Sequence, residues 1–433
     1  MEHIAEIEKI VAGGKGLARP DSGKVIMTDF VLPGETVRVQ KVREYTGYIE
    51  GKLLEVLSPS PQRIKPECPH YGECGGCDLQ HAHYRAQLEI KKTILTEAMV
   101  RAGISLPAEG VEDAVSSPAQ WGYRCRLRLK IDQNGRLGFF KKKSNRFIAI
   151  NNCPVTAATV NSALVELQTT GYLKGLAENC NEVELLQSPI DRKITLVVLL
   201  TNKKPPPTAI IQAISACTHL DSIGYKTGNK FYQLVPAQNP ATLSQKISLP
   251  NHKQTCTLSW TACCFSQVNA EQNEQLVQLV CRLAGEIQDT SILDLYCGMG
   301  NFAVPLALLG AAVTGIELNR ESIKRAKRNA ESAGVICSFF AADVHNSLRQ
   351  LIKDRQQVNT IILDPPRRGI GKTAGLLPKL GPRQIIYISC DPATLARDLA
   401  TVCKQGYIIR KLIPVDMFPQ THHIESVALL EKN

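Results

Sequence analysis

The chain has 433 residues, of which 44% are hydrophobic and 21% are charged, and its formal net charge is +11. This composition is typical of a globular protein and excludes a disordered or fibrous one. A chain of this length is expected to form about three domains. No apolar run approaches the roughly 18 residues of a membrane helix, and the acidic N-terminus does not resemble a signal peptide. We therefore expect a cytoplasmic protein without a membrane partner.

Residues 1–60 are predicted to form a small barrel of short strands. Glycine turns at 12–16 and 32–35 separate apolar segments, and residues 34–43 alternate apolar with charged side chains. The segment resembles the TRAM domain, an OB-like RNA-binding barrel, so its lysines and arginines are expected to face nucleic acid. The alternative is a barrel whose basic residues only keep it soluble. A proline-rich linker at 58–61 ends this domain.

Three cysteines follow at a spacing typical of a metal centre. Cys68, Cys74 and Cys77 form a C-x5-C-x2-C pattern with glycines among them, and Cys153 is the expected fourth ligand. Disulfides are not expected in a chain without an export signal. The spacing favours a [4Fe-4S] cluster, and a structural zinc site with four thiolates is the alternative. We assign the site to a central α+β domain over residues 61–256.

The central domain also contains a concentrated positive charge. Nine basic residues lie between Trp121 and Arg146, against the single acid Asp132. A helix is predicted over 79–103, and cations then alternate with apolar residues up to Ile131, which predicts a strand with one charged face. Asn134-Gly135 predicts a hairpin turn. Such a face suits phosphate contact and base stacking, although a merely solvated strand has the same pattern.

From residue 257 onward, strands alternate with helices as a parallel α/β sheet requires, and acids end successive strands. Asp294 precedes Gly298-Met-Gly300, Glu317 closes the next apolar run, and Asp343 and Asp364 end two more. Because two glycines without a third do not form a pyrophosphate cradle, S-adenosylmethionine fits better than a dinucleotide. Each acid alone is equally explained as a helix cap.

Two residues near the C-terminus have the chemistry of a covalent mechanism. Cys390 ends an apolar run just before Pro392, where a starting helix is expected to lower the thiol pKa and favour the thiolate. Glu425 lies in a later segment and supplies a carboxylate for proton transfer. The alternatives are a buried, inert thiol and a surface charge on the last strand.

These motifs together resemble the RNA uracil-C5-methyltransferase family over nearly the whole chain. The resemblance rests on Phe-Ser-Gln-Val-Asn at 265–269, the glycine motif at 294–302, Ser-Cys-Asp-Pro-Ala-Thr-Leu-Ala-Arg-Asp at 389–398 and the terminal element at 417–426. It implies Cys390 as nucleophile and Glu425 as base. The resemblance also implies a set of cofactor contacts: Gln267, Tyr296, Asn301, Glu317, Asp343 and Asp364. The family usually has asparagine where this chain has Asp391, which leaves the hydrogen bonding beside the thiol open.

The resemblance implies methylation of uracil C5 in RNA by a Rossmann-like, S-adenosylmethionine-dependent domain over residues 257–433. The TRAM-like barrel and the four cysteines resemble the branch that modifies 23S rRNA, and we expect a monomer. A tRNA substrate is the alternative within the family. A non-catalytic RNA-binding protein and a redox iron–sulfur protein are the alternatives from other classes, but neither needs both Cys390 and Glu425.

Overall fold

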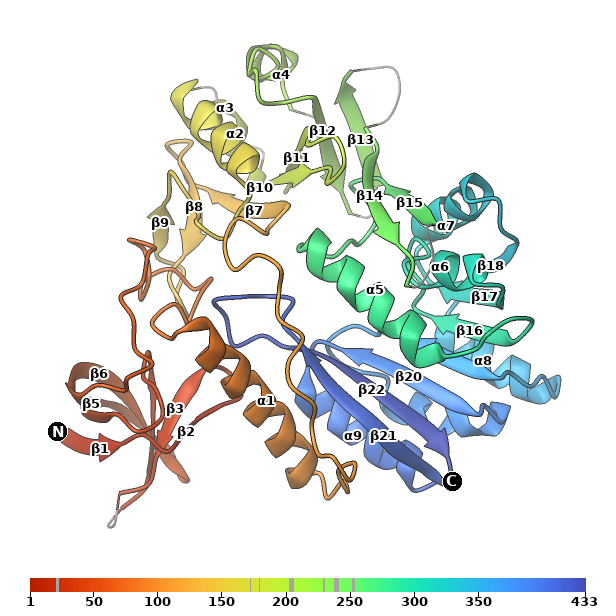
Figure 1. Ribbon diagram of the computed structural model, residues 1–433. Helices are drawn as coiled ribbons and strands as arrows, with labels where there is room; N and C mark the ends of the chain where they lie inside the picture. The colour runs from red at the N-terminus through yellow and green to blue at the C-terminus, as the bar shows by residue number, and fades with distance from the viewer. Residues whose placement is uncertain are drawn as a thin grey trace.

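The structure, a computed structural model, describes residues 1–20, 23–171, 173–178, 180–201, 206–228, 230–236, 241–250 and 254–433. Three sheets dominate it, one for each third of the chain (Figure 1). Among the described residues, no helix is long and apolar enough to cross a membrane.

The N-terminal sheet has six strands in the order β1-β5-β6-β4-β3-β2. Their bounds are β1 Glu2–Glu6, β2 Lys9–Val11, β3 Lys15–Ala18, β4 Val25–Asp29, β5 Thr36–Glu44 and β6 Tyr48–Ser58. The inward positions are apolar and buried, including Ile26, Val37 and Val39. Gly16 is required in β3, because a Cβ there would lie 2.2 Å from a methyl group of Val31. This strand-rich domain agrees with the predicted barrel.

The central sheet has seven strands in the order β13-β12-β11-β10-β7-β8-β9. The strands are β7 Arg126–Ile131, β8 Leu137–Phe140, β9 Phe147–Ala149, β10 Cys180–Gln187, β11 Ile194–Leu200, β12 Ser222–Thr227 and β13 Lys230–Val235; the helices are α2 Ala158–Thr169, α3 Leu173–Ala177 and α4 Thr208–Ile214. Antiparallel pairing of β7 with β8 confirms the hairpin predicted at Asn134-Gly135.

The C-terminal sheet has the order β18-β17-β16-β19-β20-β22-β21 and confirms the predicted α/β class. Its strands are β16 Ser291–Leu295, β17 Ala312–Glu317, β18 Cys337–Ala341, β19 Thr360–Leu363, β20 Gln384–Ser389, β21 Tyr407–Val415 and β22 Glu425–Lys432. The helical elements are α5 Ala270–Ala284, α6 Ala303–Leu308, α7 Arg320–Ser332, α8 Val344–Lys353, η1 Gly371–Leu380 and α9 Pro392–Cys403. β16 to β20 are parallel, whereas β22 runs antiparallel to both β20 and β21.

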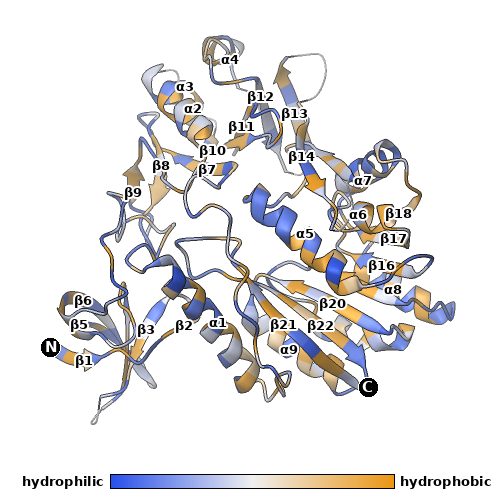
Figure 2. Ribbon diagram, viewed as in Figure 1, coloured by the Kyte–Doolittle hydropathy of each residue, from blue (hydrophilic) through white to orange (hydrophobic). Residues whose placement is uncertain are grey.

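Alternate residues of these buried strands supply two apolar layers, one on each face of the sheet. Ile292 and Ile362 contact the layer that contains α5, α6 and α7, whereas Leu293 and Ile361 contact the layer that contains α8 and α9. The continuous apolar runs of the central strands are visible in Figure 2. A parallel sheet covered on both faces is expected to have such runs.

Helix α1 (Tyr84–Arg101) joins the barrel to the C-terminal sheet and confirms the predicted helix. Its Ile90 and Ile94 belong to the apolar core of the barrel, while Leu95 and Met99 belong to the core beneath α9. The hairpin of β14 (Leu243–Ser248) and β15 (Thr255–Trp260) also packs with the C-terminal domain, against α5 and α7. α1 and β14 therefore lie inside the predicted central segment, 61–256, but pack with the C-terminal domain, and β15 crosses the predicted boundary.

Candidate active site and cysteine pocket

The structure brings Cys390 and Glu425 to the same edge of the C-terminal sheet. β20 ends at Ser389, directly before the cysteine, and β22 begins at the glutamate. Because Ser389 pairs with Ser426 in the antiparallel register, the next pair outward is Cys390 and Glu425. This is the edge at which the parallel strands end and where open α/β sheets bind their ligands.

Burial dominates the chemistry of the Cys390 thiol and raises its pKa to about 11, with further contributions from the charges of Glu425 and Asp364. Arg367 opposes this shift through its charge and a hydrogen bond. The expectation that the helix N-terminus lowers this pKa was wrong for the free protein, because loss of solvent outweighs the helix. The thiol is half-buried, so it is not the inert core cysteine considered above.

Asp391 has a defined structural role beside the nucleophile. It is the N-cap of α9, and its carboxylate accepts a hydrogen bond of 2.8 Å from the backbone N–H of Thr394. Pro392 occupies the first turn, where the missing N–H costs nothing. An asparagine side-chain oxygen makes the same bond, so the departure from the family pattern preserves the cap.

Glu425 and Asp364 form a pair of carboxyl groups beside the thiol, of which Glu425 is buried and Asp364 is half-buried. Glu425 is 2% exposed, and burial raises its pKa well above the ordinary range, with Asp364 adding repulsion and Arg367 opposing it. Burial also raises the pKa of Asp364, to about 7. Within the described part of the chain, Oε1 of Glu425 has no hydrogen-bond partner. A buried, unsatisfied carboxyl at a ligand edge is typical of a catalytic group.

A second carboxylate fixes the loop that follows Asp364. Asp398 on α9 accepts hydrogen bonds from the backbone N–H groups of Ile370 (2.7 Å) and Gly371 (3.0 Å) and from the Tyr387 hydroxyl (2.8 Å). Gly369 has a φ of 66°, and a Cβ there would lie 2.4 Å from a carboxylate oxygen of Asp398. This clamp holds the segment that contains Arg367 beside Cys390.

Three of the six predicted cofactor residues lie at the ends of β16, β17 and β18. Tyr296, in the turn after β16, is half-buried with a φ of 63°, a strained conformation for a residue with a side chain. Glu317 accepts a hydrogen bond of 2.7 Å from the backbone N–H of Asn319. Asp343 caps α8 through a 2.9 Å bond from Asn346, so the helix-cap alternative describes its contact in the structure.

The other three predicted residues have different surroundings. Asp364 lies beside Cys390 and Glu425. Asn301 exchanges two side-chain hydrogen bonds of 3.0 Å with Asn273 on α5, so its amide is already paired. Gln267 is half-buried in the loop before α5, beside Cys125 at the start of the central hairpin. Of these three residues, only Asp364 lies beside Cys390 and Glu425.

The sequence interpretation missed Arg367 and Asp398 and gave Asp294 no specific role. Asp294 is completely buried, and burial raises its pKa well above the ordinary range, with Asp364 and Glu317 adding repulsion. Arg367 lies three positions after Asp364, an acid at the end of a strand. This position in the sequence indicates that Arg367 lies at the ligand edge. Asp398 has no such signal, because its partners are main-chain groups of a distant loop.

The four predicted metal-ligand cysteines line one pocket, together with Tyr123, Phe139 and Pro154. Asn161 holds the loop around Cys153, because its side chain accepts from the Cys153 N–H at 3.0 Å and donates to the Cys153 carbonyl at 3.1 Å. Across the ranges that the structure describes, however, no three His, Cys, Asp or Glu residues are close enough to hold one metal ion. The thiols surround a common space without converging on a point.

The basic surface of the central hairpin is largely ion-paired. Arg128 and Lys130 on β7 pair with Glu182, and Arg126 pairs with Glu184, both on the neighbouring strand β10. Farther along the hairpin, Arg136, Lys142 and Lys143 pair with Asp132, Asp29 and Glu50 respectively. The sequence count of nine cations against one acid therefore overstates the free positive charge of this surface.

The C-terminal fold and the ligand edge define an S-adenosylmethionine-dependent methyltransferase. A model of the tRNA (uracil-5-)-methyltransferase family matches residues 83–433, and the chain belongs to this family.

Known relatives are similar over nearly the full length. The 23S rRNA (uracil(1939)-C(5))-methyltransferase RlmD of Shewanella frigidimarina is 35% identical over 434 residues, covering 97% of this chain and 93% of that protein. The protein of the same description from Acinetobacter baumannii strain AB0057 is 32% identical and covers 100% of this chain and 96% of its own. The crystal structure of Pyrococcus abyssi tRNA (uracil-54, C5)-methyltransferase in complex with S-adenosyl-L-homocysteine has a TM-score of 0.73 at 25% identity, covering 99% of both chains.

Proposed function

We propose that this enzyme methylates C5 of a uracil in 23S rRNA, with Cys390 as nucleophile and Glu425 as base. The observation that supports this most strongly is the position of a half-buried thiol and a buried carboxyl across from each other at the ligand edge of a methyltransferase sheet. The full-length similarity to enzymes described as acting on 23S rRNA supports the substrate.

The proposed reaction is covalent catalysis. The sulfur of Cys390 adds to C6 of uracil, and the electron pair of the C5–C6 double bond moves into an enolate. C5 then takes the methyl group from S-adenosylmethionine, and the sulfonium sulfur leaves as the neutral thioether of S-adenosylhomocysteine. Glu425 removes the C5 proton, the double bond reforms, and the Cys390 thiolate departs. The thiol of Cys390 loses its proton before it adds to C6 and can regain one after it departs. The C5 proton passes from Glu425 to solvent, so one proton is released for each methyl group transferred.

The environment of the two residues matches these roles. A raised pKa makes Glu425 a stronger base than an exposed carboxylate once it is ionised, as proton removal from carbon requires. Arg367 favours the ionised forms of both groups, because its positive charge lowers the pKa of each. Asp364 lies beside both, and we propose that it also contacts the cofactor.

We propose that Gln267, Tyr296, Asn301, Glu317 and Asp343 hold S-adenosylmethionine along this edge. Carboxylates at the ends of strands suit ribose hydroxyls and the adenine amine, and the strained backbone of Tyr296 lets the turn after β16 approach a ligand closely. Support for the cofactor itself comes from the similar methyltransferase structure with bound S-adenosyl-L-homocysteine.

We propose that Cys68, Cys74, Cys77 and Cys153 hold a [4Fe-4S] cluster. Four thiols around a mainly apolar pocket are the donor set that such clusters use. A single zinc ion bound by four sulfurs at about 2.3 Å is the alternative occupant of this pocket. When bound, the cluster supplies a compact anionic core; we assign it no step in methyl transfer.

The proposed RNA contacts lie on the barrel and the central hairpin. Phe140 is 37% exposed with Lys130 5.0 Å from its ring centroid, a pairing that suits a stacked base beside phosphate. The target uridine has to leave its stack or lie in a single strand for a thiol to reach C6. We also propose that the enzyme is a monomer and acts in the cytoplasm, where the rRNA that its relatives are described as modifying is found.

A covalent trap tests the function. The enzyme is incubated with S-adenosylmethionine and either 23S rRNA or tRNA transcripts that contain 5-fluorouridine, whose C5 fluorine cannot be removed as a proton. We expect a stable protein–RNA adduct with 23S rRNA that is absent in Cys390→Ala. Adduct with tRNA alone would contradict the substrate proposal, and methylation without any adduct would contradict the covalent mechanism. On unmodified RNA, Glu425→Gln is expected to accumulate adduct.

A further inference from the structure

Many of the contacts that hold the segment leading into Glu425 come from side chains outside its own domain. This base loop, residues 416–424, connects β21 to β22. Lys91 on α1 donates 3.0 Å to the Phe418 carbonyl and forms a fully buried ion pair with Asp416. The hydroxyl of Tyr123 donates to the Pro419 carbonyl at 3.1 Å. The loop has no regular structure of its own, so these contacts determine where β22 begins.

The middle of the base loop contains a strained residue, Gln420, with a φ of 70°. Its backbone N–H donates 2.8 Å to the side chain of Gln87, and its side-chain oxygen accepts 3.0 Å from the same amide. Its carbonyl accepts hydrogen bonds from the backbone N–H groups of Asp78 (3.1 Å) and Leu79 (3.0 Å). A left-handed conformation of a residue with a side chain persists only when its surroundings enforce it.

Asp78 makes the most direct connection between the cysteine loop and the base loop. It follows Cys77 in the chain and is 7% exposed. Its carboxylate accepts a hydrogen bond of 2.7 Å from the His422 backbone N–H and also contacts Nδ1 of the same histidine. One carboxylate therefore fixes both the main chain and the ring of a residue three positions before Glu425.

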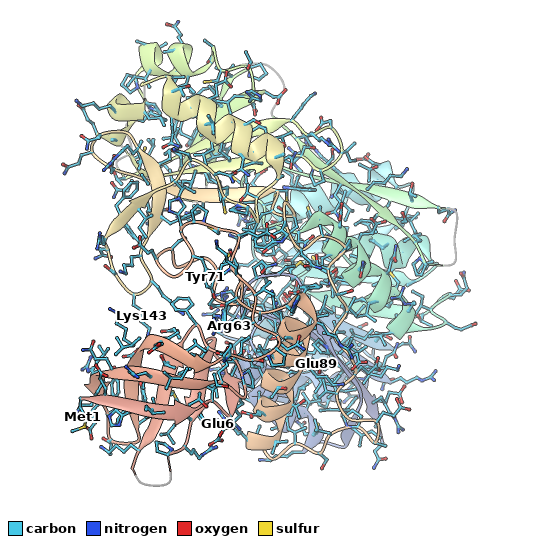
Figure 3. The ribbon with its side chains drawn as sticks, turned by 60° about the vertical axis from the view of Figure 1, so that its left-hand side comes forward. Met1, Glu6, Arg63, Tyr71, Glu89 and Lys143 are labelled. Carbon is cyan, nitrogen blue, oxygen red and sulfur yellow. The ribbon has the colours of Figure 1, made fainter. Side chains whose placement is uncertain are left out.

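The barrel packs against the contact between Asp78 and His422. Gly14, in the turn between β2 and β3, has a φ of +74°, and a Cβ there would lie 2.9 Å from a carboxylate oxygen of Asp78 and 3.2 Å from Cβ of His422. Tyr71 of the cysteine loop reaches the barrel as well, with its ring 5.2 Å from that of Phe30. Figure 3 shows Tyr71 and Arg63 between the barrel and the remainder of the molecule. Three domains thus meet at one carboxylate.

We propose that Asp78 is a positioning residue for the base loop, and that the rate at which Glu425 removes the C5 proton depends on it. The proposal rests on the proposed function for that step. It follows from the chain of contacts: Asp78 holds His422, the hydrogen bonds to Gln420 hold the turn, and Glu425 then enters β22 opposite Cys390. A displacement of about 1 Å at a reacting group costs on the order of 100-fold in rate.

The test compares Asp78→Ala with Asp78→Asn and with the control Asp113→Ala, whose carboxylate is exposed and pairs with Lys92. Adduct formation on 5-fluorouridine RNA reports the steps before proton removal, and turnover on unmodified RNA includes that step. We expect Asp78→Ala to lose roughly 10- to 100-fold in turnover while its adduct formation and its affinity for S-adenosylhomocysteine stay at the wild-type level. Asp78→Asn keeps an acceptor for the His422 N–H and is expected to recover most of the turnover.

Two measurements distinguish a failure of the proposal for Asp78 from a failure of the proposed function. Hydrogen exchange of peptides covering 416–425 is expected to accelerate in Asp78→Ala and not in Asp113→Ala, whatever reaction the enzyme catalyses. Gln87→Met, which releases Gln420 from the other side, is expected to give the same kinetic pattern if Asp78→Ala folds poorly. Unchanged exchange, wild-type turnover, or a parallel loss of adduct formation and turnover would overturn the role of Asp78. Absence of adduct in the wild-type enzyme would instead overturn the proposed function.

Discussion

At the scale of single residues, burial sets the chemistry of the active site more than any local feature of the chain. The thiol of Cys390 and the carboxyl groups of Asp364 and Glu425 all have raised pKa values because the folded protein removes them from water. Local sequence predicted that the first and last are reactive groups, because each lies in a distinctive motif. It misjudged the direction of the thiol shift, since a helix start is visible in a sequence and burial is not.

The raised thiol pKa is tested by alkylation. We expect the rate of Cys390 modification by iodoacetamide to rise about tenfold per pH unit between about pH 7 and 9, because only the thiolate reacts and its pKa of about 11 lies above this range. In Asp364→Asn, loss of a neighbouring charge lowers this pKa, so the rate at a given pH increases. Peptide mass spectrometry follows Cys390, and Cys403 in the same digest serves as the control. A plateau below pH 8 would contradict the shift.

The buried carboxyl of Glu425 should cost stability. Its folded pKa lies above its unfolded pKa, so between the two values the folded protein holds a proton that the unfolded chain has lost, and stability falls as pH rises. Glu425→Gln removes this cost and is expected to raise the free energy of unfolding at pH 8 by about 1–2 kcal/mol. The gain is expected to shrink toward about pH 4.5, the unfolded value.

Denaturant unfolding at several pH values measures this difference. Glu431→Gln is the matched control, because it lies on the same strand with its side chain 35% exposed and paired with Arg410. A pH-independent difference for Glu425→Gln would show that this carboxyl is not shifted upward.

At the scale of elements, the sequence pattern predicted helix α1, the hairpin of β7 and β8, and the α/β alternation correctly. These predictions succeeded because they depend on periodicity and turn residues, which are local. The pairing of Arg126 and Arg128 with Glu184 and Glu182 was not predicted, because the partners lie on β10, more than fifty residues later in the chain. The sequence of one segment does not show which strand will be its neighbour in a sheet with crossovers.

The N-cap of α9 gives a prediction at this scale. Asp391→Asn retains a side-chain oxygen for the Thr394 N–H, so we expect stability and turnover close to those of the wild type. Asp391→Ala leaves that N–H without its partner and is expected to lower the free energy of unfolding by about 1 kcal/mol. Thermal denaturation and methylation assays of the two variants measure this. A large loss in Asp391→Asn alone would show that the charge, and not the cap, matters beside Cys390.

At the scale of the whole molecule, the domains are less separate than the chain order suggests. Residues 84–101 and β14 lie in the predicted central segment but pack with the C-terminal domain, and β15 crosses the predicted boundary. The apolar residues of α1 indicate that the helix is buried, but not that two different domains cover it. The meeting of the four cysteines from two distant segments was predicted from their chemistry rather than from their separation in the chain.

The buried ion pair of Lys91 and Asp416 joins α1 to the C-terminal domain, and its loss is expected to affect the entire fold. Lys91→Met leaves a buried carboxylate without its cation and should lower the free energy of unfolding by about 3–5 kcal/mol. Lys92→Met, which removes a neighbouring exposed pair, is expected to change it by less than about 1 kcal/mol. Calorimetric unfolding compares the two. Equal effects would show that the buried pair does not bind the domains together.

The antiparallel direction of β22 limits the changes of sequence that this enzyme can accept. In a sheet of parallel strands, only residues that follow a strand reach the rim where ligands sit. Because β22 runs antiparallel to β20, its first residue, Glu425, lies at the same edge of the sheet. Main-chain pairing of β22 with β20 sets the position of Glu425 relative to Cys390. Inserting one residue within β22 would turn the carboxylate to the opposite face of the sheet. We therefore expect this strand to accept substitutions but no insertion.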